Sequence, residues 1–331
     1  PSQLLSNMFG KGEEFLREAF MNIQTPAFVS GILIDGIYVT LAWVVSVMLP
    51  PMAIFFPMFT LLEDLGYLPR IAFNLDKCFK KCCSCGKQAL TMCMGLGCNA
   101  AGIIGCRIIN SPRERLIAII TNVFMPCNGR FPMLITISSI FIGGMVGGIK
   151  GGFISALTVT CVIILGVFMT LIVSKILSKT VLKGVPSSFI LELPSYRKPQ
   201  IGKVIVRSIF DRTLYVLGRA IAVAAPAGIV IWVFSNISIG DGTLLSVCAD
   251  FLNPFANMIG VDGYILMALI LGFPANEIVM PIIIMSYLRA NKMLELESLV
   301  ELKQLLVANG WTLLTAINTM ILCLMHYPCG T

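Results

Sequence analysis

Cysteine thiols and polar side chains interrupt apolar runs of this sequence that are long enough to cross a membrane. Residues 95–102 read Gly-Leu-Gly-Cys-Asn-Ala-Ala-Gly, which places a thiol and an amide among three glycines that oppose a continuous helix. Backbone carbonyls freed by such a break need partners at membrane depth, and broken helices of this kind hold ions in transporters. Close packing of helices on small residues is the alternative use of these glycines.

Two further breaks and a second Pro-Cys pair carry similar chemistry. Residues 126–132 read Pro-Cys-Asn-Gly-Arg-Phe-Pro, residues 272–277 read Gly-Phe-Pro-Ala-Asn-Glu, and residues 328–329 are Pro-Cys. Thiol, amide and carboxylate ligands suit a late first-row divalent ion or Cu(I) better than Na⁺ or Mg²⁺, which prefer oxygen cages. We therefore predict a transition-metal site formed by Cys98, Asn99, Cys127, Asn276, Glu277 and Cys329. The alternative for each cysteine is packing as a small hydrophobe, which we expect for Cys161, Cys248 and Cys323.

The composition is that of a membrane protein. Of 331 residues, 57% are hydrophobic and 12% are charged, and the mean hydropathy is +0.89, whereas roughly a quarter of the residues of a soluble domain are charged. The net charge is +7, but Lys and Arg lie in short loops between apolar runs, so they indicate topology and not a nucleic-acid partner. We expect an all-α, polytopic protein embedded in a lipid bilayer.

Two halves of the chain repeat one pattern at an offset of 176 to 177 residues. The matching pairs are Asp35 with Asp211, Pro50 with Pro226, and Gly95 with Gly272. The first apolar run precedes the basic residues 63–87 and is expected to run inward, whereas its counterpart at 213–236 precedes an acidic segment and is expected to run outward. Inverted repeats place a transport site at their interface near the midplane. Chance matching of Gly and Pro is the alternative, because both are common in membrane helices.

The repeat and the charges predict four parts. Residues 1–34 are expected to form an interfacial amphipathic segment, with an ordinary helix on the soluble side as the alternative. Residues 35–177 form the first repeat, 178–210 a basic cytoplasmic loop, and 211–331 a second, C-terminally truncated repeat. Because basic residues flank the first break on both sides, we expect it to be a re-entrant hairpin with both ends in the cytoplasm.

Two other features could bind metal. Cys78, Cys82, Cys83 and Cys85 stand among lysines, which are expected to lower the thiol pKa values and favour metal capture or redox sensing, although the paired CxxC spacing of zinc sites is missing. The single histidine, His326, is expected to cap a helix end instead of ligating a metal.

Several motifs together resemble the membrane part of the bacterial ferrous iron transport protein B family. They are residues 62–67 (Leu-Glu-Asp-Leu-Gly-Tyr), 94–99 (Met-Gly-Leu-Gly-Cys-Asn), 113–116 (Arg-Glu-Arg-Leu) and 126–132, and the similarity covers nearly the whole chain. The two repeats resemble that family's paired gate, or nucleoside-recognition-like, domains. The resemblance implies Fe²⁺ uptake by a multi-pass permease of the bacterial cytoplasmic membrane, with Cys98, Cys127 and Cys329 on the iron path.

The resemblance also implies partners, and the sequence departs from it in places. A cytosolic GTPase domain and small accessory iron-transport proteins are expected, and a homo-oligomer is left open. The chain has no G-x₄-G-K-[ST] phosphate loop, so we expect GTP to act only through a domain absent here, with no catalytic residue in this chain. Asn276 stands where the family commonly has Lys. A permease for nucleosides or other organic solutes is the alternative function, and a non-transporting membrane scaffold is a third.

Overall fold

The computed structural model describes residues 2–22, 26–81, 85–184, 201–239, 242–290 and 298–330, together with Met293 and Leu296. Within these ranges almost all regular structure is helical, and the strands there, β1 (Ser238–Ile239) and β2 (Gly242–Thr243), form one short antiparallel hairpin. The predicted all-α class is therefore confirmed. Cys82, Cys83 and residues 185–200 of the expected basic loop lie outside the described residues.

Three helical stretches are long and apolar enough to cross a membrane, and up to five if each bent pair is one span. The three are Phe28–Asp64, Gly148–Lys179 and Ile201–Asn236. The bent pairs are α13 (Leu244–Ile259) with α14 (Gly263–Leu271), at 107°, and α16 (Leu299–Ala308) with α17 (Leu313–Met325), at 105°. Helix α10 (Gly148–Lys179) exposes large apolar side chains such as Ile164 and Phe168, as a lipid-facing helix does. The chain is a polytopic membrane protein.

The first and third long stretches have the same internal plan. One consists of α2 (Ala27–Ser30), the π-helix η1 (Gly31–Tyr38) and α3 (Val39–Asp64). The other consists of α11 (Ile201–Arg207), the π-helix η5 (Ser208–Thr213) and α12 (Leu214–Asn236). The two π-helices begin at Gly31 and Ser208, at the offset of 177 residues found in the sequence. Sequence periodicity alone did not predict the π-helices.

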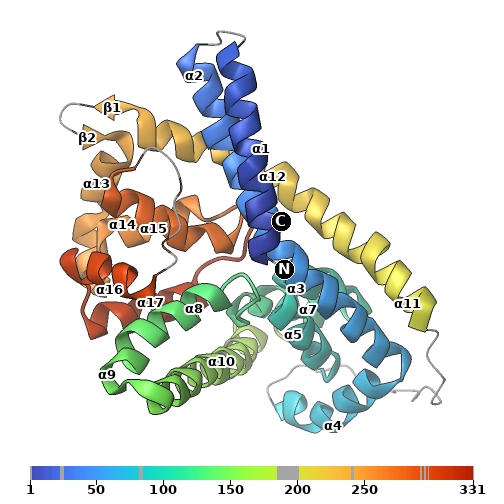
Figure 1. Cartoon of the computed structure of the whole chain (residues 1–331). Helices are drawn as coiled ribbons and strands as arrows, with labels where there is room; N and C mark the ends of the chain where they lie inside the picture. The colour runs from blue at the N-terminus through green and yellow to red at the C-terminus, as the bar shows by residue number, and fades with distance from the viewer. Residues whose placement is uncertain are drawn as a thin grey trace.

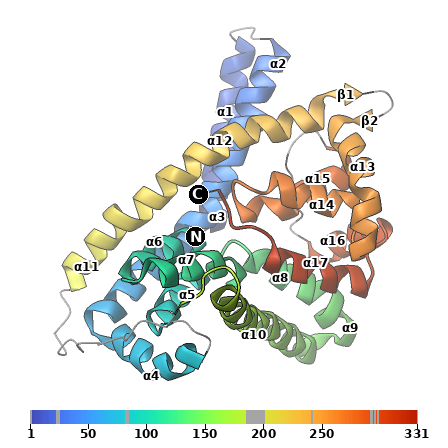
Figure 2. The ribbon, with the colours of Figure 1, turned by 180° about the vertical axis from the view of Figure 1, so that it is seen from behind.

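The two equivalent stretches cross in opposite directions (Figures 1 and 2). Near the start of one and the end of the other, Gly36 lies against Gly228. At the opposite ends, Ser208 Oγ donates to Thr60 Oγ1 over 2.9 Å. Because the start of each stretch meets the end of its equivalent, the repeats are inverted, as the charge pattern predicted.

Each repeat contains a hairpin that re-enters on itself. In the first, α5 (Lys87–Gly97) and α6 (Asn99–Gly105) turn at Cys98, and Lys87 Nζ donates to the Ile108 carbonyl over 2.9 Å, which ties the two ends together. In the second, α14 turns into η6 (Asn276–Ile278) and α15 (Val279–Leu288), and the rings of Tyr264 and Tyr287 lie 5.7 Å apart at its ends. The chain therefore turns back on itself at Cys98, as the expected hairpin requires, and the same turn recurs in the second repeat.

Further helices complete the described part of the chain. They are α1 (Ser2–Asn22), α4 (Tyr67–Lys81), η2 (Cys106–Ile108), α7 (Pro112–Thr121), η3 (Asn122–Phe124), α8 (Phe131–Ile137), η4 (Ser138–Gly143) and α9 (Gly144–Val146). The sequence break at 126–132 separates η3 from α8, as predicted. The acidic segment that follows residue 236 contains the apolar helix α13, which packs on α14. Its Leu245, Ala249 and Ala256 are buried, a pattern that the three aspartates of the segment obscured in the sequence.

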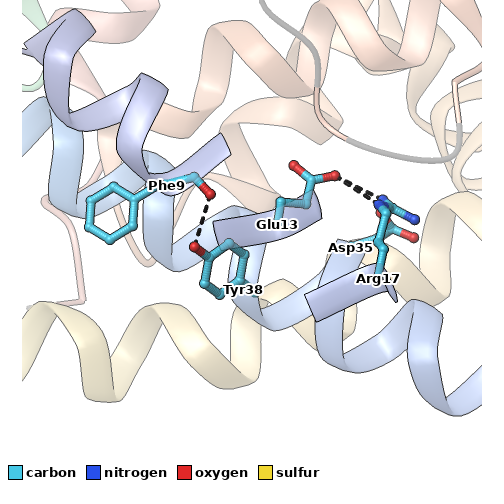
Figure 3. A network of polar contacts seen from close by, with 5 residues as sticks. All are labelled: Phe9, Glu13, Arg17, Asp35 and Tyr38. Atoms are coloured by element: carbon cyan, nitrogen blue, oxygen red, sulfur yellow. Dashed lines mark hydrogen bonds and ion pairs between the residues drawn. The ribbon is translucent and has the colours of Figure 1, made fainter. Parts of the chain in front are cut away.

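Helix α1 is anchored to the first π-helix by polar contacts (Figure 3). Arg17 pairs with Glu13 on its own helix and with Asp35 in η1. One turn away, Tyr38 Oη donates to the Phe9 carbonyl over 2.9 Å. Arg17 thereby supplies the counter-charge for an acidic residue placed within an apolar stretch, where an unpaired carboxylate would be costly.

The close crossing at Gly228 yields a first prediction. A Cβ there would lie 2.2 Å from the Gly36 carbonyl oxygen, so Gly228→Ala must separate the two helices and should cost ~1–3 kcal/mol. Gly218→Ala, on the same helix α12 but with no neighbouring atom within 4 Å, is the matched control and should be neutral or stabilising through helix propensity. Thermal unfolding of the detergent-purified variants measures both. Equal melting temperatures for the two variants would contradict the close approach of Gly228 to Gly36.

Candidate metal site

The tip of each hairpin is held by the Pro-Cys segment of its own repeat. Cys98 (φ −152°, ψ 123°) and Ala275 (φ −153°, ψ 126°) give the two tips the same extended turn. Beside the first tip, the Asn128 N–H donates to the Gly97 carbonyl over 3.3 Å. Beside the second, the Gly330 N–H donates to the Phe273 carbonyl over 2.7 Å. Each donor directly follows the cysteine of a Pro-Cys pair, so each tip lies beside the Pro-Cys pair of its own repeat.

The thiols gather around the first tip. Cys98 and Cys127 are each 6% exposed, and Cys98 lies close enough to Cys127 and Cys329 to interact with both electrostatically. Cys98 also lines a pocket of about 290 Å³ bounded by Asn128 and by Phe55 and Met52 of α3. The structure therefore brings the three predicted cysteines into one region with open space beside it.

Glu277 reaches from the second hairpin to the break of the first repeat. A Cβ on Gly129 would lie only 2.4 Å from Glu277 Oε1, so the carboxylate rests directly on that glycine. Trp43 of α3 donates its indole N–H to the Glu277 carbonyl over 3.4 Å. Among the described residues no lysine, arginine or histidine forms an ion pair with this carboxylate.

Asn276 joins the two repeats. Its Nδ2 lies 3.6 Å from Cys127 Sγ, and its Oδ1 lies 3.2 Å from His326 Nε2. His326 lies just beyond α17, and its Nδ1 contacts the Cys323 carbonyl at 2.8 Å, which confirms the predicted helix cap. Its place beside Asn276 was not predicted, because 50 residues separate the two in the sequence and no motif links them.

Asn99 has a different environment from its repeat equivalent. The amide is 1% exposed, and in the orientation that satisfies its neighbours its nitrogen donates to the carbonyls of Met125, at 3.1 Å, and Gly95, at 3.3 Å. Asn122 Nδ2 in turn donates to the Asn99 carbonyl over 3.2 Å. Asn99 thus satisfies backbone groups that the glycine break frees, which ties the first tip to the second break of the same repeat.

Arg130 donates hydrogen bonds to backbone carbonyls at the C-terminal end of α17. The side chain is fully buried, and its Nη1 donates to the carbonyls of Val123, at 2.9 Å, and Leu324, at 3.0 Å. Its Nη2 donates to the carbonyls of His326 and Tyr327, both at 3.0 Å. The partners of this intramembrane arginine are therefore backbone carbonyls of both repeats, which fixes His326 relative to the break at Cys127.

The predicted ligands share a region but do not form one coordination sphere. Within the described ranges, no three His, Cys, Asp or Glu side chains stand close enough together to hold a metal ion. Asn99 is engaged with backbone carbonyls, and Asn276 lies between Cys127 and His326. A metal that enters here would have to be bound in steps or after a local rearrangement.

We expected the lysines around Cys78, Cys82, Cys83 and Cys85 to lower the thiol pKa values. This expectation is wrong for Cys85, the member of the cluster whose side chain the structure describes. Cys85, in the connection between α4 and α5, is 3% exposed, and burial, followed by the nearby Glu114, raises the pKa of its thiol to about 11. Hydrogen bonds from the backbone of Gln88 and Lys87 lower this pKa, but by less than burial raises it.

The fold and the site define a polytopic membrane protein with two inverted gate repeats whose hairpin tips meet. The nucleoside recognition (gate) family model matches residues 45–141 and 217–331, one match in each repeat. The model of the ferrous iron transport protein B C terminus matches residues 159–211, between them. The chain belongs to the ferrous iron transport protein B family.

Curated relatives support this assignment. The Fe(2+) transporter FeoB of Staphylococcus aureus (strain COL) is 30% identical over 310 residues, which are 91% of this chain and 44% of the relative. The Fe(2+) transporter FeoB of Methanocaldococcus jannaschii is 27% identical over 342 residues, 99% of this chain and 48% of the relative. The chain thus spans about half the length of these relatives. No solved structure matches it.

The buried guanidinium gives a second prediction. Arg130→Lys keeps the charge, but an ammonium cannot reproduce the planar guanidinium that donates hydrogen bonds to four carbonyls. Each buried carbonyl left without a donor should cost ~1–3 kcal/mol of folding free energy. We expect faster hydrogen exchange in residues 326–330 and a lower melting temperature. Arg107→Lys, at an exposed arginine, is the control. Unchanged exchange in residues 326–330 of the Arg130 variant would show that the fork does not hold this segment.

Proposed function

We propose that this chain is the membrane permease part of a ferrous iron uptake transporter in the cytoplasmic membrane of a bacterium. Fe²⁺ is the transported substrate, and the chain itself catalyses no reaction. The names of the relatives support Fe²⁺ as the cargo. The proposed partners are the bilayer, a cytosolic GTPase domain that supplies any GTP dependence, and small accessory iron-transport proteins. A homo-oligomer is compatible with this function.

The observation that carries the proposal is the carboxylate of Glu277 resting on the break that holds Cys127. An ionisable residue at membrane depth is expensive and marks an ion pathway when no protein charge compensates it. A passing cation supplies the missing charge. The thiols of Cys98, Cys127 and Cys329 are soft ligands, which favour Fe²⁺ over Na⁺, Mg²⁺ and Ca²⁺.

The geometry supports a path between the two tips. Cys98 borders the pocket beside α3, whereas Glu277 and Asn276 lie on the second tip, so an ion passing from one tip to the other meets thiol and then carboxylate and amide groups. Asn99 shapes the first tip by holding its carbonyls. Because the ligands are dispersed, the ion would be bound weakly enough at each step to leave again, as conduction requires.

The third prediction tests the cargo and the role of Cys98 together. In proteoliposomes under anaerobic conditions, we expect saturable Fe²⁺ uptake that exceeds uptake of Mn²⁺ and of uridine. Cys98→Ser nearly preserves volume but replaces a soft ligand with a hard neutral one, so Fe²⁺ uptake should fall at least about tenfold while the melting temperature changes little. Cys161→Ser, at an exposed cysteine of α10, is the matched control.

Two results would overturn the proposal. Saturable uridine uptake with Fe²⁺ uptake no faster than in empty vesicles would favour the organic-solute permease. Equal Fe²⁺ uptake by the Cys98 and Cys161 variants would remove the first tip from the iron path.

A further inference from the structure

The one histidine of the chain is held in an orientation typical of a metal ligand. Its Nδ1 lies 2.8 Å from the Cys323 carbonyl, and a carbonyl only accepts hydrogen bonds, so Nδ1 carries the proton. Metal-binding histidines almost always donate one ring N–H in this way, which fixes the ring and directs the lone pair of the other nitrogen. In His326 that other nitrogen, Nε2, faces the side chain of Asn276 at 3.2 Å.

The surroundings favour the neutral ring. The Arg130 guanidinium donates to the backbone carbonyl of His326 itself, so a second positive charge on the imidazole would face a fixed cation in an apolar interior. A neutral ring with its proton on Nδ1 accepts a hydrogen bond at Nε2. The structure places Asn276 Nδ2 beside Cys127 Sγ and Oδ1 beside Nε2, so a ring protonated on Nδ1 can accept a hydrogen bond from this amide only after the amide turns over about its Cβ–Cγ bond.

Asn276 therefore lies between His326 Nε2 and Cys127 Sγ, two atoms of types that bind metal ions. One end of its amide is 3.2 Å from His326 Nε2, and the other is 3.6 Å from Cys127 Sγ. Imidazole and thiolate together suit Fe²⁺ and its late first-row neighbours and discriminate against Na⁺, Mg²⁺ and Ca²⁺. Glu277 follows Asn276 in the chain, and its carboxylate lies on Gly129, two residues from Cys127.

We propose that His326 Nε2 and Cys127 Sγ are ligands of one Fe²⁺ binding site, which the side chain of Asn276 closes in the present conformation. This inference rests on the proposed function, adds His326 to it as a ligand, and changes the role of the Asn276 amide from ligand to closing group. Fe²⁺ binding displaces the Asn276 amide from both atoms, and the Cys127 thiol loses its proton as the metal–sulfur bond forms. Glu277 is the adjacent base that can accept this proton or ligate the ion. Arg130 holds both sides of the site, since it bonds Val123 and His326.

Because His326 is the only histidine, an imidazole signal from bound iron identifies it. The fourth prediction uses iron K-edge X-ray absorption on the whole chain, purified without a histidine tag and loaded with Fe²⁺ anaerobically. We expect multiple scattering from one imidazole together with a sulfur shell. His326→Gln should lose the imidazole component, and Cys161→Ser should keep both. A wild-type spectrum without imidazole scattering, or the same spectrum for the His326 variant, would overturn the inference.

A second variant separates closing from ligation without removing the histidine. Asn276→Ala removes the closing amide and should tighten equilibrium Fe²⁺ binding by about tenfold, because binding no longer requires displacement of that group. Asn309→Ala, at an exposed asparagine after α16, is the control. Weaker Fe²⁺ binding by the Asn276 variant would show that the amide is a ligand and contradict its closing role. If wild-type protein binds no Fe²⁺ at all, the proposed function itself fails, whereas sulfur scattering without imidazole rejects only the His326 site.

Discussion

The structure depends on the need to hydrogen-bond backbone groups that two broken hairpins free at membrane depth. At each tip the partner is the residue after a Pro-Cys cysteine, Asn128 for Gly97 and Gly330 for Phe273. Irregular backbone survives in a bilayer only with such partners, so the segments that carry Cys127 and Cys329 are drawn to the tips for structural reasons. The same contacts place thiols along the proposed ion path.

The two repeats share a backbone but differ in chemistry at equivalent positions. Cys98 and Ala275 have the same turn geometry, yet the first has a thiol and the second has only a methyl group. Asn99 is bonded to backbone carbonyls, whereas its equivalent Asn276 contacts only the side chains of Cys127 and His326 in the hydrogen bonds described above. The first tip is thus held through contacts to backbone carbonyls, and Asn276 at the second tip is held through side chains. Inverted symmetry thus supplies the backbone frame, and sequence differences give the two tips different side-chain chemistry.

The sequence predicted the features that follow from local backbone chemistry. Glycines, prolines and their spacing predicted the breaks and the repeat, and the placement of basic and acidic residues predicted its inversion and the hairpin at Cys98. The four carbonyls that accept hydrogen bonds from Arg130 could not be predicted, because chain segments from both repeats meet there only in the fold. His326 was interpreted only as a cap, since its second contact depends on tertiary packing. The π-helices η1 and η5 leave no signature in composition or apolar periodicity.

Alkylation footprinting of the cysteines during Fe²⁺ binding tests the central claim, that an iron path runs between the two tips, most directly. The chain contains its own controls, because Cys161 and Cys248 lie on α10 and α13, outside the proposed path. The account predicts that Fe²⁺ slows alkylation of Cys98, Cys127 and Cys329, measured by mass spectrometry, and leaves Cys161 and Cys248 unchanged. Alkylation rates at the three path cysteines that do not respond to Fe²⁺, or that change equally with those of the controls, would contradict it.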